Sequence, residues 1–232
     1  MDDRCIAVLD SGIGGVITLK KLKEKYPNEN FVYFADLKNF PYGNKSEKEL
    51  KDIAFSNYKR LLSFGVKVVV FACNTLSVTA EECFTNSPVP VIGVKPIARK
   101  QGKGLLICTP KTANSVYVQQ LKKDADLTVL PQDGLADEIE LSFEGKPIDL
   151  KKRFLGVSRD YDYLSLGCTH YPFLTKEFEK IFPKSRIISG EELIFDKFNK
   201  IVTTANPNRK NGIVLFVGDG RKKAEQLFNR IF

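Results

Sequence analysis

The 232-residue chain holds a single histidine, and its five cysteines form no CxxC pair. Zinc sites draw on closely spaced cysteines and histidines, so the sequence argues against a metal centre. No apolar run approaches the roughly 20 residues that a membrane-spanning helix needs, so we expect no membrane contact. Residues 1–10 carry acidic side chains ahead of a predicted strand, so we expect no signal peptide. Reduced thiols in the cytoplasm are then the simplest expectation.

The composition is that of an ordinary globular protein, with 43% hydrophobic and 28% charged residues. The length is enough for one large domain or two small ones. The net charge of +8 is uneven, because residues 197–232 contain eight lysines and arginines but only two acids. That segment could contact nucleic acid or an acidic partner. A solvated helix face is the alternative that we favour.

Short, unbroken apolar runs alternate with longer amphipathic stretches along the whole chain. Such runs are typical of strands that are buried on both faces, and alternation of strand and helix predicts parallel sheets flanked by helices. The sequence therefore predicts an α/β fold with mainly parallel sheets. The predicted strands are 5–9, 31–35, 67–71, 90–93, 104–108, 126–130, 162–166, 185–188 and 212–217. The predicted helices are 14–25, 46–64, 75–86, 110–123, 133–144, 172–182, 190–200 and 219–231.

The two halves of the chain look like a loose repeat. AVLDSGIGG and VVVFACNT in the first half correspond to LLICTPKTANS and YLSLGCTH in the second half. We therefore expect two α/β lobes related by a pseudo-twofold axis, with an active-site cleft between them. The predicted first lobe is 1–95 plus 191–232, and the second is 96–190. The boundary carries no low-complexity linker.

Two cysteines stand in matching positions, one in each half. Cys73 and Cys168 each follow a strand-like run and precede small polar residues. Ligands of open α/β sheets bind beyond the carboxyl ends of the strands, where these thiols should lie. An enzyme that inverts a carbon centre needs an acid and a base on opposite faces of that carbon. Two equivalent thiols facing each other across a cleft would supply that pair.

Other polar residues gather at the same strand ends. Asp10 and His170 are candidates to take up or relay protons, and the backbone N–H groups of Tyr42 and Gly43 could receive a carboxylate. DSGIGG lacks the GxGxxG pattern, which favours a plain strand-to-helix turn over a nucleotide site. We expect the three remaining cysteines to be small buried apolar residues. They are Cys5, Cys83 and Cys108.

DSGIGG, PYGNKS, ACNT and GCTHYP, in this order and at this spacing, closely resemble the motifs of bacterial glutamate racemases. These enzymes belong to the cofactor-independent aspartate/glutamate racemase superfamily. The resemblance runs from the first strand to about residue 174, and the closing segment LFVGDGRKKAEQLFNRIF is also similar. It implies interconversion of L- and D-glutamate without a cofactor, which provides D-glutamate for the cell wall.

The resemblance also implies roles for individual residues. Cys73 would act on the D-enantiomer with help from Asp10, and Cys168 on the L-enantiomer with help from His170. The other implied contacts hold the substrate, whose two carboxylates need amide and hydroxyl donors. The substrate-binding residues would be Asp10, Ser11, Tyr42, Gly43, Asn74, Thr75, Thr112, Thr169 and His170.

The chain departs from the family in several places. The chain is shorter than family members, and the missing residues fall mainly between residues 131 and 157. The family also has a glutamate that supports the histidine, and this glutamate has no clear match in VLPQDGLADEIE. Asp133 or Glu138 could take that role, and the sequence leaves the choice open. Lys95 stands where the family often has an acid beside a proline, and Ala35 stands where glycine is common. These departures leave the dimer mode, regulation and exact substrate in question.

Two rival functions therefore remain. One is racemisation of another acidic amino acid such as aspartate, because the short middle segment would permit a changed pocket. The other is a non-catalytic binding or regulatory protein that kept the fold, motivated by the missing glutamate and the basic C-terminal region. A contact with DNA gyrase or nucleic acid would belong to that second reading. Family members are commonly dimers, so we expect a homodimer.

Overall fold

The structure is a computed structural model that describes residues 2–201 and 211–231. The described residues divide into two compact units. One contains the chain up to Val94 and from Glu191 onward, and the other is Lys95–Gly190. The predicted lobe boundary differs from this division by one residue. That the two units are separate domains stays a prediction.

The first unit is built on a parallel sheet in the order β4-β3-β1-β2-β9. Its central strands are buried on both faces, which explains their unbroken apolar sequences. The outer β9 is only partly buried. The strands are β1 (Cys5–Asp10), β2 (Phe31–Ala35), β3 (Val66–Phe71), β4 (Val91–Gly93) and β9 (Val214–Val217).

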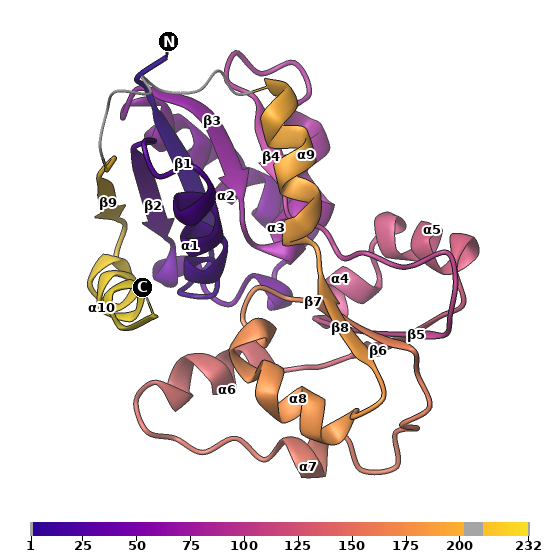
Figure 1. Ribbon diagram of the computed structural model, residues 1–232. Coiled ribbons are helices and arrows are strands. Elements are labelled where there is room, and N and C mark those ends of the chain that lie inside the picture. The colour runs from indigo at the N-terminus through magenta and orange to yellow at the C-terminus, as the bar shows by residue number, and fades with distance from the viewer. Residues whose placement is uncertain (1, 202–210, 232) are drawn as a thin grey trace. The chain divides into compact units, whose positions relative to one another are not determined.

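Helices cover both faces of this sheet (Figure 1). One face is covered by α1 (Val16–Lys25), α9 (Glu191–Ile201) and α10 (Arg221–Ile231). The other is covered by α2 (Glu47–Leu62) and α3 (Asn74–Ala80). The short 3-10 turns η1 (Leu37–Asn39) and η2 (Tyr42–Asn44) lie between β2 and α2, and η3 (Glu81–Phe84) follows α3.

The local sequence explains where these helices begin and how they pack. Ser46 and Glu49 form a capping box at the start of α2, as the sequence predicts. Successive residues of a strand point to opposite faces, so Leu9 of β1 and Phe71 of β3 face the same core as Leu50 of α2. Burial of this apolar face holds the sheet and helices together.

The second unit has a parallel sheet in the order β6-β5-β7-β8. Its strands are β5 (Gly104–Cys108), β6 (Leu127–Pro131), β7 (Tyr163–Gly167) and β8 (Arg186–Ser189). One face packs on α4 (Pro110–Ala113) and α5 (Val116–Asp124), through a core that includes Leu106, Cys108 and Val118.

The remaining helices of the second unit form a separate aromatic cluster. They are α6 (Leu135–Ser142), α7 (Leu150–Arg153), the 3-10 turn η4 (Tyr171–Leu174) and α8 (Thr175–Ile181). Phe154, directly after α7, meets Phe178 of α8 with ring centroids 5.8 Å apart, and it meets Phe182 at 5.5 Å. Edge-to-face pairs of this kind stabilise a core beyond their buried area.

The predicted α/β architecture is confirmed, including the repeat at the level of strand order. The β2-β1-β3-β4 part of the first sheet has the same connectivity as β6-β5-β7-β8, and β9 is an addition at the outer edge. The predicted helix at 110–123 was wrong in one respect, because Ser115 caps a new helix and separates α4 from α5. The short α7 was not predicted. No helix in the described residues is long and apolar enough to cross a membrane.

Candidate active site

The candidate site of the first unit lies at the carboxyl ends of β1 and β3. These strands are neighbours, and the N–H of Ala72 donates to the carbonyl of Leu9 at 2.9 Å. Asp10 and Cys73 therefore emerge side by side, and both are buried. The hydroxyl of Ser11 donates to the sulfur of Cys73 across 3.9 Å. This strand pairing brings together residues that are more than 60 positions apart in the sequence.

The loop after β1 orients the Asp10 carboxylate. The N–H of Gly12 donates to Asp10 Oδ1 at 2.9 Å, and the Tyr33 hydroxyl donates to the Gly12 carbonyl at 2.9 Å. A Cβ on Gly15 would lie 2.8 Å from the Cβ atoms of both Asp10 and Ala72. Glycine at position 15 thus allows the loop to pass close to the end of β3.

Cys73 is the N-cap residue of α3. Its carbonyl accepts hydrogen bonds from the Ser77 N–H at 2.9 Å and the Ser77 hydroxyl at 2.8 Å. The buried Asn74 and Thr75 form the first turn of the helix, and Asn74 Nδ2 donates to the Val94 carbonyl at 3.3 Å. Helix N-termini stabilise negative charge, so this position suits a thiolate and an anionic ligand.

Tyr42 and Gly43 begin the 3-10 turn η2, where the first N–H groups have no acceptor within the turn. The Tyr42 hydroxyl donates to Asp36 Oδ2 at 2.6 Å, and Asn57 Nδ2 donates to the same oxygen at 2.8 Å. Burial raises the pKa of Tyr42 well above its ordinary value, and the negative charges of Asp36, Cys73 and Asp10 add to the effect. The hydroxyl is therefore engaged with Asp36, which leaves the two backbone N–H groups as the predicted donors to a carboxylate.

The second unit has its candidate site at the carboxyl ends of β5 and β7, which are also neighbours. Thr109 caps α4, and its hydroxyl donates to Thr112 Oγ1 at 3.0 Å while it accepts the Thr112 N–H at 3.2 Å. Cys168 and Thr169 follow β7, and both are buried. Gly167 permits this packing, because a Cβ there would lie 2.7 Å from the Cβ of Cys108.

His170 lies between a thiol and a carboxylate. Its Nδ1 is 3.8 Å from the sulfur of Cys168, and its Nε2 is 2.9 Å from Glu140 Oε1. Complete burial tends to lower the pKa of His170. The hydrogen bonds with Cys168 and Glu140 and their negative charges outweigh it, so the pKa lies well above the ordinary value. The protonated ring can donate to both partners at once.

The partner of His170 was wrongly predicted, because it is Glu140 and not Asp133 or Glu138. Arg153 binds Glu138 through Nε at 3.1 Å and holds the Asp133 carbonyl at 2.9 Å. Residues two apart on an α-helix point in nearly opposite directions, so Glu140 takes the buried side of α6 when Glu138 faces Arg153. The sequence contains a signal for this choice. Ala136 lies four residues before Glu140, so the two residues share one face of α6, and an alanine there indicates that the face is buried.

The other cysteines differ from one another in burial. Cys108 is fully buried, and burial together with the negative charge of Cys168 raises its pKa to about 12. Cys5 is partly buried. Cys83 is exposed, so the prediction that it is a buried apolar residue was wrong. Cys83 lies in η3, which follows the C-terminal end of α3, and this position explains its exposure. Within the described residues, no cluster of three or more ligating side chains could hold a metal ion.

No family model matches the chain. A curated glutamate racemase from Clostridium acetobutylicum is 36% identical over 205 residues, which cover 81% of this chain and 79% of that relative. Glutamate racemase RacE1 from Bacillus anthracis is similar in structure, with a TM-score of 0.83 and 26% identity over all of this chain and 93% of that one. The Francisella tularensis glutamate racemase, solved in complex with D-glutamate, gives a TM-score of 0.79 and 27% identity over 99% of this chain and 95% of that one. With this identity over four-fifths of its length, and with the same fold, the chain belongs to the glutamate racemase family.

Proposed function

We propose that the protein interconverts L- and D-glutamate, with Cys73 and Cys168 as the two acid/base groups. The observation that carries the proposal is the matched surroundings of the two thiols. Each follows a central parallel strand, and each sulfur has a hydrogen-bonding side chain within reach, Ser11 for Cys73 and His170 for Cys168. The Clostridium relative is a glutamate racemase, and the Francisella relative binds D-glutamate, which supports the choice of substrate.

The proposed reaction begins with a thiolate on one face of the α-carbon. With L-glutamate, the Cys168 thiolate removes the α-proton, and the Cys73 thiol delivers its own proton to the opposite face. With D-glutamate the roles reverse. The raised pKa of His170 keeps the imidazole protonated, so that its Nδ1–H can stabilise the Cys168 thiolate. Glu140 is a positioning residue, because it acts through the ring and not on the substrate.

The carbanion that forms between the two proton transfers needs electrostatic stabilisation. We propose that the N–H groups of Tyr42 and Gly43 hold one substrate carboxylate. The side chains of Asn74, Thr75, Thr112 and Thr169 would hold the remaining polar groups. These donors sit on buried turns and helix starts, so they need little reorganisation when charge develops.

The product of this reaction supplies D-glutamate for peptidoglycan. A location in the cytoplasm and assembly as a homodimer stay predictions. The hypothesis of a regulatory protein loses one of its two arguments, because the buried Glu140 lies 2.9 Å from His170 Nε2 and can support the ring as the family's glutamate would. Its other motive, the basic segment 197–232, lies partly outside the described residues, and a gyrase or nucleic-acid contact is untested.

Steady-state assays with the four acidic enantiomers test the proposed function. Racemisation is followed by the change in circular dichroism after addition of L- or D-glutamate, and in parallel of L- or D-aspartate. We expect kcat/KM for both glutamate enantiomers to exceed that for aspartate by at least about 100-fold, because a site that pairs two carboxylates rejects a shorter spacing between them. If kcat/KM for aspartate equalled or exceeded that for glutamate, aspartate would be the substrate instead. Absence of turnover of all four enantiomers would overturn the proposal.

A further inference from the structure

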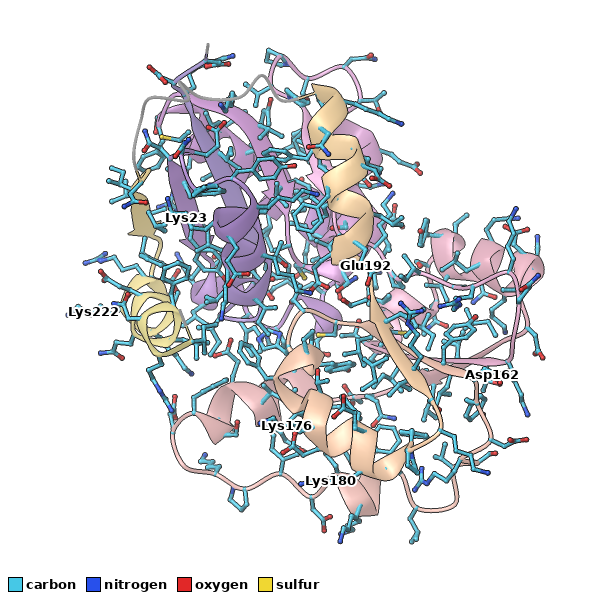
Figure 2. The ribbon with its side chains drawn as sticks, in the orientation of Figure 1. Lys23, Asp162, Lys176, Lys180, Glu192 and Lys222 are labelled. Atoms are coloured by element: carbon cyan, nitrogen blue, oxygen red, sulfur yellow. The ribbon has the colours of Figure 1, made fainter. Side chains whose placement is uncertain are left out.

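Three buried side chains of the first unit form a closed hydrogen-bonded cluster beside the turn η2. They belong to Asp36, which follows β2, to Tyr42 of η2 and to Asn57 of α2. The Tyr42 hydroxyl and Asn57 Nδ2 donate to Asp36 Oδ2, at 2.6 and 2.8 Å, and Asn57 Nδ2 lies 3.4 Å from the Tyr42 hydroxyl oxygen. All three residues are at most 3% exposed, within the side chains that fill the space between the first sheet and its helices (Figure 2).

The chemistry of the three groups fixes the direction of each hydrogen bond in this cluster. An ionised carboxylate can only accept, so the tyrosine hydroxyl and the asparagine NH₂ group both donate to Asp36. The NH₂ group has a second proton, which can be donated to the oxygen of Tyr42. Asn57 is therefore the member that donates to both of the others. Hydrogen bonds to a charged acceptor are the stronger ones, and burial strengthens them further.

The cluster anchors the turn that carries the proposed donors to a substrate carboxylate. The N–H of Tyr42 belongs to the same residue as the anchored hydroxyl, and the N–H of Gly43 follows it in η2. The N–H of Lys45 closes the turn by donating to the Tyr42 carbonyl at 3.2 Å. The N–H of Asp36 donates to the Asp10 carbonyl at 3.0 Å, which ties the cluster to the end of β1. The anchored hydroxyl thus restrains the position of both donor N–H groups.

We propose that Asn57 is a positioning residue for the substrate, because it holds the Asp36 carboxylate against the Tyr42 hydroxyl and so keeps η2 in the shape that receives a carboxylate. Asn57 acts through Tyr42 and not on the substrate itself. The effect on catalysis rests on the proposed function, whereas the effect on the turn does not. The substrate carboxylate is charged before the α-proton leaves, so the turn stabilises substrate and transition state alike. Loss of the cluster should therefore raise KM and change kcat little.

Asn57→Leu removes both donors and keeps a side chain of similar size. We expect KM for both enantiomers of glutamate to rise at least about 5-fold, with kcat within about 3-fold of the native value, in the circular dichroism assay. Urea denaturation of the variant shows how much of it is folded. A merely structural role would lower the free energy of unfolding and leave KM of the folded protein unchanged. KM within about 2-fold of the native value, or a fall confined to kcat, would overturn the proposal.

Asn57→Asp adds a pH dependence that a merely structural role would not produce. It places a second carboxyl group beside Asp36, and two carboxyl groups at that distance share one proton. The shared proton restores the bond at low pH, and its loss makes the two groups repel at high pH. The ratio of the variant's KM to the native KM should therefore fall at least about 3-fold from pH 9 to pH 6, whereas the ratio for Asn57→Leu should stay constant. Tyr42 and its charged neighbours Cys73 and Asp10 are present in every variant, so their titration cancels in these ratios. A constant ratio for Asn57→Asp would contradict the proposal.

Hydrogen exchange of the Lys45 amide reports on the turn without any substrate, because this N–H closes η2. NMR should show exchange at least about 3-fold faster in Asn57→Leu than in the native chain. Ser56→Asp, on the exposed side of α2, is the matched control and should leave both exchange and KM within about 2-fold. Equal exchange in Asn57→Leu and the native chain would overturn the proposal. Absence of racemisation by the native chain would overturn the proposed function, and the exchange rates would still decide whether Asn57 holds the turn.

Discussion

Glu140 Oε1 lies 2.9 Å from His170 Nε2, on the ring edge that does not face Cys168. The carboxylate accepts the Nε2–H bond of the protonated ring and so directs Nδ1–H toward the thiol. Catalysis at Cys168 should therefore depend on a residue that does not touch the substrate.

Replacement of this carboxylate by an amide tests that dependence. Glu140→Gln should lower kcat for L-glutamate by about 10- to 100-fold, as is typical when a group that orients an acid/base residue is lost. It should also lower the pKa of His170, because one of the hydrogen bonds that raise it is lost. Circular dichroism measures kcat, and NMR titration of the single imidazole measures the pKa of His170.

Glu138→Gln is the matched control, two residues away on the same helix. Glu138 pairs with Arg153, so kcat should stay within about 3-fold of the native value. If the two variants were equally impaired, the assignment of Glu140 as the positioning residue would be wrong.

Unfolding should depend on pH through His170. Its pKa in the folded protein lies well above the unfolded value of about 6.5. Its contribution to stability is therefore complete below about pH 6.5 and is lost as the pH rises through the folded pKa. The free energy of unfolding of the native chain minus that of His170→Asn, from urea titrations, should fall from pH 6 toward pH 9. A constant difference across that range contradicts the raised pKa.

Lys67 and Glu29 form a buried ion pair at the amino ends of β3 and β2, with Nζ and Oε2 2.7 Å apart. Lys67→Met alone should cost about 3–5 kcal/mol of unfolding free energy, because it leaves a buried carboxylate without its counter-ion. The double variant Lys67→Met with Glu29→Leu should recover most of that loss.

Both variants lie at the sheet edge away from Cys73, so kcat of the folded fraction should not change. Chemical denaturation of the native chain, the two single variants and the double variant measures the coupling. Additive losses in the double variant would show that the pair does not act as a buried ion pair.

The exposed and buried cysteines should react differently with iodoacetamide. Only the thiolate is nucleophilic, and a pKa of about 12 leaves Cys108 with about one thiolate in ten thousand at pH 8. Peptide mass spectrometry should find Cys83 labelled in the native protein and Cys108 labelled only after denaturation in urea. Labelling of both at the same rate in the native protein would contradict the burial of Cys108.

Most of the fold could be predicted because its signals are local. Each of the nine described strands coincides with an apolar run, and the Ser46 capping box marks the start of α2. The break at Ser115 was missed because the amphipathic pattern continues across it, although a serine before Val116 is itself an N-cap signal. The four-residue α7 has too few residues for a periodic pattern to be recognised.

The candidate site was less predictable, because it depends on neighbours that are distant in the sequence. Cys73 and Cys168 could be selected from their place at strand ends. The pairing of Tyr42 with Asp36 and the choice of Glu140 over Glu138 depend on which side of a turn or helix becomes buried. Tertiary packing decides the pairing of Tyr42, whereas Ala136 already marks in the sequence the face of α6 on which Glu140 lies.

Racemisation in deuterated buffer tests the two-thiol account most directly. If one thiol removes the α-proton and the other delivers a solvent-derived one, the product formed early in the reaction carries deuterium at the α-carbon, and the remaining substrate keeps its original proton. NMR and chiral chromatography should give this result for both enantiomers of glutamate, and Cys73→Ser and Cys168→Ser should each lose inversion in both directions. Product that retains the substrate's own proton, or substrate that gains deuterium as fast as product forms, would show that a single base serves both faces.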